Sequence, residues 1–436
     1  MPDGPPEIEP PPAPVREVLP GRRRPRRCPY HCGHMRAIRA VFLANGMSMG
    51  VFFPFAAVIL STRGFSPAEI GLIQALSSAA FTIAVPAWGH LADVVLGRRN
   101  ALVISALTGA AAVLAAGSPI PALGVAACFV AFSLFESGWG PLGDALAVNA
   151  VADRARDYAR VRLLSSGGFA ASSALVGLLY DRTGYGPAFA LCAAFAIGLA
   201  VVARLTPDVP RADLAAHGSG RRRGGSMAVA LRVQPRVRGV LLAVLLVNIG
   251  VIAGFTFLPL RMVALGGSPS DVALIASVGA FAEIPAMLVA GAVAARIGLR
   301  GLVAGSAFLY AACFVGWAVL DSPALIIATR FASGFAFAGL WVGAVLTMAV
   351  LLPPRLQATG QGLYQVTGYG VAAVVANLVG GQVYASLGAS VLFGGVAVLA
   401  VAAAILALVV FPRAGESQVP VDDLAASLPF ATPTLG

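Results

Sequence analysis

Three ionisable side chains lie inside long apolar stretches of this sequence. Glu136 follows the run AFSLF, Glu283 lies between GAFA and IPAMLVAG, and Arg330 follows PALIIAT. Ionisable groups are costly to keep in apolar surroundings, so each is a candidate for function. A carboxyl group there can take up and release protons, and a guanidinium can hold an anion or balance an acid. We predict proton coupling by Glu136 and Glu283 and ligand binding by Arg330.

Polar and aromatic residues in similar stretches could complete a binding site. Those that form hydrogen bonds or present flat rings are Asn45, Asn248, Gln361, Tyr364, Trp139 and Trp341. Structural roles stay open for all of them, because interhelical hydrogen bonds and ring packing use the same residue types. Glu283 could likewise bond at a kink made by Pro285, and Arg330 could extend towards the membrane surface.

The composition identifies the environment that holds these residues. Of 436 residues, 58% are hydrophobic and 11% charged, and the mean hydropathy is +0.85. A soluble domain has about 25% charged residues, and a helix needs about 20 apolar residues to cross a bilayer. The sequence predicts twelve such spans, over 37–61, 67–92, 99–117, 121–150, 158–180, 186–204, 238–261, 269–295, 301–320, 323–352, 356–384 and 389–411.

The positive charge indicates the orientation in the membrane. The net charge is +11, all 30 cationic residues are arginine, and they cluster in alternate connections, whereas the connections at 117–121 and 385–390 have none. Basic loops face the cytoplasm, and an even number of spans places both termini on that side. We therefore expect a multi-pass protein of the cell membrane, plasma or inner, with no nucleic-acid partner.

The predicted spans form two similar halves. A shift of 202 residues aligns FSPAEIGLI with GSPSDVALI, and a shift of 204 aligns GLLYDRTG with GQVYASLG. We expect a cytoplasmic tail without a signal peptide, a six-helix bundle, a linker, a second bundle and a tail, over 1–35, 36–204, 205–235, 236–412 and 413–436. Parallel repeats of this kind are typical of secondary transporters, which bind substrate between the halves.

The stretch WGHLADVVLGRR closes the second span and leads into the third. It resembles the loop motif of the major facilitator superfamily, with Val94 in place of a base and one extra residue before the second glycine. The resemblance implies an all-α membrane fold of twelve helices in two pseudo-symmetric bundles. It also implies a cytoplasmic charge latch, made by Asp93 and Arg98, within the gating set Gly89, Asp93, Gly97, Arg98 and Arg99.

Four further segments resemble the phenylpropionate permease-like branch of that superfamily, which is related to nucleoside:proton symporters. They are PLGDALAV, YARVRLLSSGGF, EIPAMLVAGAVAARIGLR and LQATGQGLYQVTGYG, and the resemblance covers about 36–411. In this architecture spans 1, 4, 7 and 10 line the cavity, which favours Asn45 and Asn248 as substrate contacts. Asp144 is expected to take part in gating or to pair with Arg160 or Arg162.

The sequence does not predict catalysis or a resident cofactor. Neither a nucleotide-binding loop nor a nucleophile elbow is present, so we do not expect an enzyme. The stretch CPYHCGH brings together Cys28, His31, Cys32 and His34, but a closed zinc site needs a second pair of ligands at matching spacing. Whether this cluster binds metal stays open, and we expect no metal in the functional site.

These features predict a secondary active transporter that moves a small organic molecule by alternating access, coupled to protons in symport. A proton-coupled efflux antiporter for drugs or metabolites is one alternative, and a non-transporting membrane sensor or scaffold is another. The expected partners are the substrate, protons and the lipid bilayer, and we expect a monomer.

Overall fold

The computed structural model describes residues 32–150, 156–206, 227–353 and 356–413, and all regular elements in these ranges are helical. The first half contains α1 (Cys32–Phe52), η1 (Phe53–Phe55), α2 (Ala56–Thr62), α3 (Pro67–Leu91), η2 (Ala92–Leu96), α4 (Arg98–Gly117), α5 (Ala122–Glu136), α6 (Trp139–Ala150), α7 (Arg156–Thr183) and α8 (Pro187–Arg204). The second half contains α10 (Met227–Val233), α11 (Arg236–Ala264), α12 (Pro269–Val319), α13 (Pro323–Leu351), α14 (Gln357–Gln365), η3 (Val366–Val371), α15 (Ala372–Leu387) and α16 (Ala389–Val410).

Twelve membrane crossings can be assigned within these ranges. Eleven helical segments are long and apolar enough to cross a bilayer. One of them, α12, has 51 residues and would be about 77 Å long if straight, more than twice the hydrocarbon thickness of about 30 Å. It is interrupted at Gly298, where φ is 76° and ψ is 165°, so it supplies two crossings. The predicted all-α fold with twelve spans is confirmed.

The two halves repeat their turns. Gly97, between the second and third crossings, has φ of 79°, and Gly298 occupies the equivalent place in the second half. Both need the left-handed backbone region that glycine adopts without a steric penalty. The Ser-Pro pairs also open equivalent helices, because Ser66 and Ser268 each form a capping box, with Glu69 and Asp271 respectively.

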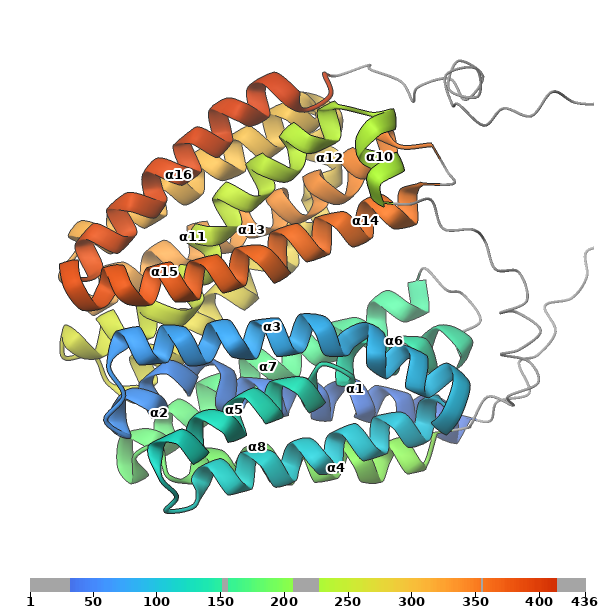
Figure 1. The fold of residues 1–436 in the computed structure, drawn as a ribbon, viewed down its shortest axis with the longest axis vertical. Coiled ribbons are helices and arrows are strands. Elements are labelled where there is room, and N and C mark those ends of the chain that lie inside the picture. Colours follow the sequence, from blue (N-terminus) through green and yellow to red (C-terminus); the bar gives the residue numbers. More distant parts are fainter. Residues whose placement is uncertain (1–31, 151–155, 207–226, 354–355, 414–436) are drawn as a thin grey trace, which may run out of the picture.

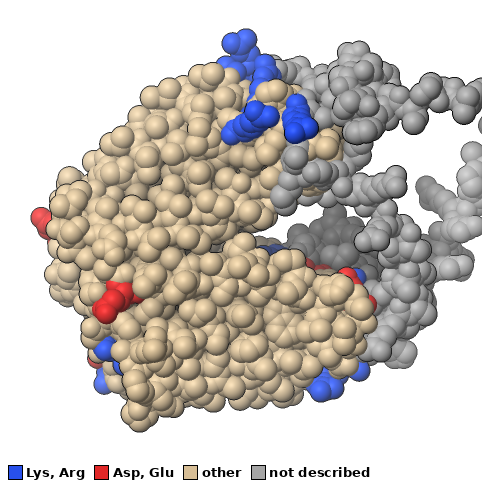
Figure 2. All heavy atoms as spheres, viewed as in Figure 1, with Lys and Arg blue, Asp and Glu red and all other residues tan. Residues whose placement is uncertain are grey.

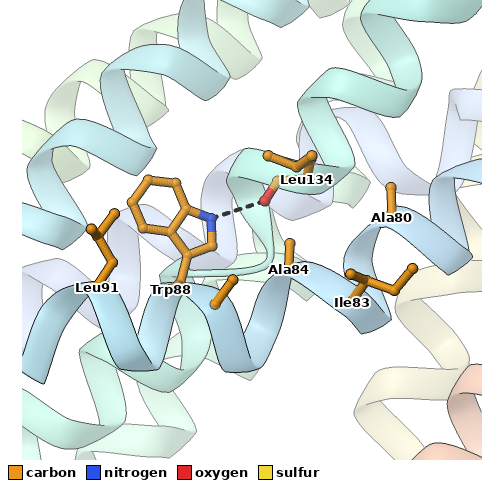
Figure 3. A pocket seen from close by; sticks show the side chains of 7 residues that line it. Ala80, Ile83, Ala84, Trp88, Leu91 and Leu134 are labelled. Carbon is orange, nitrogen blue, oxygen red and sulfur yellow. Dashed lines mark hydrogen bonds between the residues drawn. The ribbon is translucent and has the colours of Figure 1, made fainter.

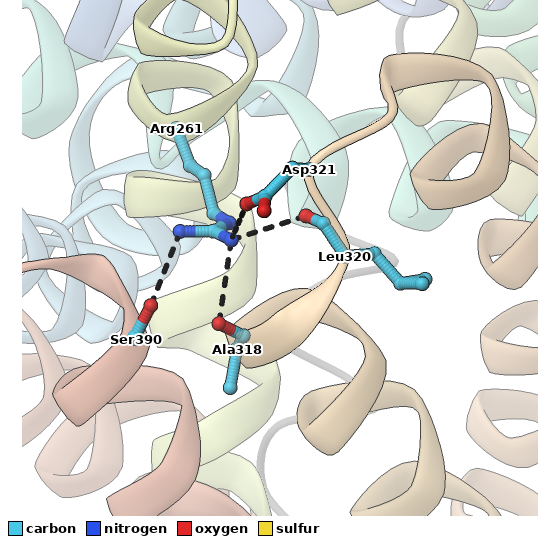
Figure 4. A network of polar contacts seen from close by, with 5 residues as sticks. All are labelled: Arg261, Ala318, Leu320, Asp321 and Ser390. Carbon is cyan, nitrogen blue, oxygen red and sulfur yellow. Dashed lines mark hydrogen bonds and ion pairs between the residues drawn. The ribbon is translucent and has the colours of Figure 1, made fainter.

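Two arginines, one in each half, cap the C-terminal ends of α4 and α12. Arg63, after α2, donates to the carbonyl oxygens of Gly117 and Ser118 at 3.0 and 3.3 Å. Arg261, on α11, donates to the carbonyl oxygens of Ala318 and Leu320 at 3.3 and 3.1 Å, and also contacts Asp321 and Ser390 (Figure 4). Each guanidinium satisfies carbonyls that a helix C-terminus leaves without partners.

Among the described residues, the two bundles lie one above the other and touch towards one end (Figure 1). Contacts between them are made chiefly by α3 with α15 and by α7 with α12. They separate towards the end that carries α10 and the start of α14, where Figure 2 shows a deep hollow between the halves. On the face shown in Figure 2, the described charged side chains lie near the two ends of the helices, and the middle is uncharged, as a lipid-facing surface requires.

Local structure departs from the expected regular spans in three places. The fourth crossing is broken between α5 and α6, and π-helical turns occur at η2 and η3. Helix α10 lies within the segment expected as a linker, over 205–235, and residues 207–226 of that segment lie outside the described ranges. π-Turns are frequent at functional sites, and η3 contributes to the site described next.

Candidate functional site

Arg330 is held firmly in the second bundle. Its side chain is 7% exposed, Nε donates to the carbonyl oxygen of Ile275 at 2.7 Å, and Nη1 donates to Oγ of Ser333 at 2.9 Å. The guanidinium carbon lies 5.4 Å from the ring centre of Trp317 and 5.6 Å from that of Phe255. Cation–π contacts of this kind stabilise a charge that is removed from water. The structure thus gives Arg330 partners on α11, α12 and α13.

Close packing around Arg330 depends on two glycines, Gly279 and Gly334. A Cβ at Gly279 would lie 2.7 Å from Nη2 of Arg330, so a larger residue would displace the guanidinium. Gly334 likewise lets α13 approach α12, since a Cβ there would lie 2.6 Å from the carbonyl oxygen of Gly279. These small residues allow an arginine to enter a helix interface that otherwise excludes charge.

Glu283 lies on α12 near that guanidinium. Its side chain is partly exposed and interacts electrostatically with Arg330. Within the described ranges, no hydrogen-bond or ion-pair partner contacts its carboxyl group. Pro285 follows two residues later and lacks the N–H that would bind the carbonyl oxygen of Phe281. The carboxyl group is therefore available to exchange a proton or to bind a ligand.

Glu136 lies at the break in the fourth crossing, where α5 ends. Its side chain is partly exposed and interacts electrostatically with Cys192 on α8. As for Glu283, the described residues supply no hydrogen-bond or ion-pair partner for its carboxyl group. The two predicted proton-coupling residues thus share one property, an unpaired carboxyl group among apolar helices, although they belong to different bundles.

Aromatic side chains form a cluster on α13, α14 and η3. The ring of Trp341 lies 5.9 Å from that of Tyr364, 5.4 Å from that of Tyr369 and 6.0 Å from that of Phe337. The hydroxyl oxygens of Tyr364 and Tyr369 are 3.5 Å apart, and Tyr369 interacts electrostatically with Glu283. Sequence reasoning selected Trp341 and Tyr364 but missed Tyr369 and Phe337, because the π-turn that orients Tyr369 has no clear sequence signal.

The three side-chain amides that were predicted to contact substrate differ in their hydrogen bonds. Asn248 is 2% exposed and its Nδ2 has no hydrogen-bond partner among the described residues, as is true of Oδ1 of Asn45. Asn248 adjoins the aromatic cluster, since a Cβ at Gly368 would lie 3.0 Å from its Nδ2 and 3.7 Å from Cε2 of Tyr364. Gln361, in contrast, donates to the carbonyl oxygen of Val345 at 2.9 Å and joins α14 to α13.

Trp139 has no surface on which a ligand could stack in this structure. It is 1% exposed, its ring packs edge-on against Phe132 at 5.8 Å, and its Cζ2 lies 2.8 Å from where a Cβ of Gly109 would be. Trp139 therefore fills the first bundle, whereas its repeat partner Trp341 is partly exposed beside the tyrosines. The repeat preserves the residue type but not its surroundings.

The predicted gating residues pair within the first bundle. Nε of Arg98 lies 3.2 Å from Oδ1 of Asp93, and Nη1 of Arg162 lies 3.0 Å from both oxygens of Asp144. Gly97 forms the positive-φ turn, Gly89 has open space around it, Arg99 belongs to α4, and the side chain of Arg160 lies outside the described residues. With the bundles apart at this end, the ion pairs given by described residues do not cross between them.

At the end where the bundles meet, glycines bring the helices into close contact. A Cβ at Gly71 of α3 would lie 2.8 Å from the Cα of Gly381 and would clash with the carbonyl oxygen of Asn377. Asn377 accepts a hydrogen bond from Thr256 at 2.7 Å and donates to Ser78 of the other bundle at 3.4 Å. Among the described residues, the junction of α3 with α15 consists of small residues and one long neutral hydrogen bond, which suits a contact that forms and breaks repeatedly.

Comparison with known proteins gives a consistent result. The model of the "MFS_1 like family" matches residues 40–394. The chain is 29% identical over 340 residues to the maltose permease of Geobacillus stearothermophilus, covering 77% of this chain and 84% of the permease. The crystal structure of the nucleoside transporter NupG superposes with a TM-score of 0.78 at 16% identity, covering 86% of this chain and 98% of NupG. That of a D-xylose-proton symporter gives 0.67 at 14% identity, with 88% and 99% covered.

Proposed function

The chain belongs to the MFS_1 like family of the major facilitator superfamily and is a multi-pass membrane transporter, and we propose that it carries out proton-coupled symport of a small organic molecule. Alternating access would proceed by rocking one bundle against the other about the contacts of α3 with α15 and α7 with α12. Transport needs no catalytic step, and we propose that a monomer in the cell membrane performs it.

One observation carries the proton-coupling proposal. The carboxyl group of Glu283 lies in the middle of a crossing, without a hydrogen-bond partner in the described ranges, and it interacts electrostatically with both Arg330 and Tyr369. A proton on Glu283 would remove one charge from this cluster. Protonation can therefore change the balance between Glu283 and Arg330 and make substrate binding depend on proton binding.

The substrate class is proposed from the cluster beside Glu283. Tyrosine hydroxyls, the unpaired amide of Asn248 and the partly exposed ring of Trp341 suit an uncharged ring compound with hydroxyl or carbonyl groups. Three comparison proteins are named for maltose, nucleosides and D-xylose, which have this chemistry. We propose that the cargo is a sugar or a nucleoside.

The orientation is proposed from the charge distribution. Basic clusters adjoin the end at which the hollow opens, so that end would face the cytoplasm and the structure would be open inward. In the opposite state the bundles would close at this end. Asp93, released from Arg98, would then contact the second bundle as the latch that the loop motif implies.

Uptake into proteoliposomes tests this proposal. With an inward proton gradient, wild-type protein should accumulate radiolabelled uridine or maltose, and Glu283→Gln should abolish the accumulation. Glu69→Gln is the matched control, because glutamine preserves the capping box at the start of α3. Full proton-driven uptake by Glu283→Gln would remove Glu283 from the mechanism. Proton-driven export of preloaded substrate would identify an antiporter, and lack of flux or stabilisation with a broad ligand panel would favour a sensor or scaffold.

A further inference from the structure

The break in the fourth crossing leaves one backbone carbonyl without its helical donor. Helix α5 ends at Glu136, and the N–H of Gly138 binds the carbonyl oxygen of Phe135 at 3.3 Å. In a regular α-helix that N–H would bind Leu134 instead. A carbonyl group freed inside a membrane must find another donor within the protein. The way in which the Leu134 carbonyl is satisfied therefore determines the shape of the chain on either side of Glu136.

Trp88 supplies a donor from a different helix. Its Nε1 donates to the carbonyl oxygen of Leu134 at 3.0 Å (Figure 3). Oγ of Ser137 donates to the same carbonyl oxygen at 2.8 Å. The indole also lies against the break, since a Cβ at Gly138 would be 3.1 Å from its Cγ. Trp88 is 8% exposed, and an apolar cavity of about 370 Å³ beside it is lined by α3 and Leu134.

The helix that carries Trp88 also contacts the second bundle. A Cβ at Gly370, in η3, would lie 3.0 Å from Cγ2 of Thr82 on α3. Pro86 lies between Thr82 and Trp88 and cannot donate to the Thr82 carbonyl, which loosens α3 between the two contacts. Movement between the bundles would therefore displace α3 near Trp88, beside the break in the fourth crossing.

The repeat shows that Trp88 and Glu136 occur together in one half only. A shift of 202 residues places Ala290 at the position of Trp88 and Ala338 at that of Glu136. Helix α13 runs without a break through Ala338. The indole, the break and the carboxyl group are thus a feature of the first bundle that the twofold repeat does not require.

We propose that Trp88 is a positioning residue for Glu136. By binding the Leu134 carbonyl, its indole N–H fixes the geometry of the break and so the direction in which the Glu136 carboxyl group is presented. This inference rests on the proposed role of Glu136 in proton coupling. The titratable group that interacts electrostatically with Glu136 is Cys192 on α8, and it is left unchanged in the test.

The test measures the chemical reactivity of both carboxyl groups in one sample. Dicyclohexylcarbodiimide reacts with protonated carboxyl groups in apolar surroundings, and mass spectrometry of the full-length protein reports the modification of Glu136 and Glu283 at each pH. Trp88→Phe keeps an aromatic ring and removes the N–H. We expect a change of about fivefold in the reaction rate of Glu136, the equivalent of one hydrogen bond, with an altered pH profile and an unchanged Glu283.

A second variant covers the case in which Trp88→Phe does not fold. Gly138→Ala keeps the indole but pushes it from the break, and it should alter Glu136 in the same selective way. An unchanged Glu136 profile in the folded variants overturns the inference. So does an equal change at Glu136 and Glu283, because that would report a general loosening of the fold.

Transport by Glu136→Gln separates this inference from the proposed function. If Glu136→Gln loses proton-driven uptake while Trp88→Phe leaves the reactivity of Glu136 unchanged, Glu136 takes part in coupling but Trp88 does not position it. If Glu136→Gln retains proton-driven uptake, Glu136 has no role in coupling. The inference about Trp88 is then contradicted as well, whatever the labelling shows.

Discussion

The carboxylate of Asp181, in the last turn of α7, binds Ser270, in the first turn of α12, and so joins the two bundles at the end where they meet. It accepts a hydrogen bond from the backbone N–H of Ser270 at 2.9 Å and another from the hydroxyl group. A carboxylate at a helix N-terminus is also favoured by the helix dipole. The equivalent junction of α3 with α15 has Ala385 in the position of Asp181, so the charged contact is present on one side only.

Removing this contact should shift the protein towards the state in which the bundles separate at this end. The dipole interaction is worth about 0.3–1 kcal/mol, so Asp181→Ala should change the ratio of the two states by roughly two- to fivefold. Ser173→Cys, in a background without the native cysteines, is a suitable reporter because Ser173 is 0% exposed between α7 and α12. A membrane-impermeant thiol reagent should label it faster in Asp181→Ala.

Asp181→Asn keeps one acceptor for the Ser270 N–H but loses the charge, so its labelling rate should lie between those of the parent and Asp181→Ala. Equal labelling of all three proteins would show that the contact does not hold the bundles together.

The close contact between Gly71 and Gly381 leads to a prediction of a larger effect at the end where the bundles meet. A side chain at position 71 meets backbone atoms of Asn377 and Gly381, which cannot rotate away. Gly71→Val should therefore keep this end open, reduce uptake about tenfold or more and expose Ser173→Cys to the thiol reagent. Gly198→Ala is the control, because a Cβ there meets nothing within 4 Å. Normal uptake by Gly71→Val would mean that the junction adapts.

Substitution of Arg330 by lysine tests whether the hydrogen bonds and ring contacts of its guanidinium, and not its positive charge alone, stabilise the second bundle. Lysine keeps the positive charge but cannot bind Ile275 and Ser333 at once in a planar fork between two rings. We expect Arg330→Lys to destabilise the protein by about 2–3 kcal/mol, seen as a lower melting temperature in detergent. Arg182→Lys, at an exposed position near the end of α7, should leave the melting temperature unchanged. A similar melting temperature for both variants would contradict the bracing role of Arg330.

Much of this fold could be predicted from the sequence because the bilayer imposes length and polarity on every span. Hydrophobic runs, arginine clusters and the shift of 202 residues indicated twelve crossings and two repeats. The interruption of α12 at Gly298 falls between the predicted spans 269–295 and 301–320, so the sequence indicated it as well. The break after Glu136 was missed, because Ser137 and Gly138 are small residues that occur in unbroken membrane helices as well.

The candidate site was harder to predict because residue type does not determine surroundings. Trp139 and Trp341 are equivalent in the repeat, yet one is enclosed in its bundle and the other is partly exposed in an aromatic cluster. Arg330 was expected in a span, but its bonds to Ile275 and Ser333 depend on tertiary packing. Tyr369 reaches the site through a π-turn, in which one extra residue per turn changes the face that a side chain occupies.

Tyr369 provides the last prediction, which concerns substrate binding. Its ring packs against Trp341 and Tyr364, so Tyr369→Phe should preserve the cluster and remove only the hydroxyl group. Loss of one hydrogen bond to a ligand costs about 1–1.5 kcal/mol, which corresponds to a rise of roughly five- to tenfold in KM for uridine or maltose. The maximal rate and the melting temperature should stay unchanged, because rings and helices remain in place. Tyr384→Phe is the matched control, since Tyr384 stacks on Phe257 at 5.7 Å, away from this cluster. An equal rise in KM for both variants, or none for Tyr369→Phe, would place the substrate elsewhere between the bundles.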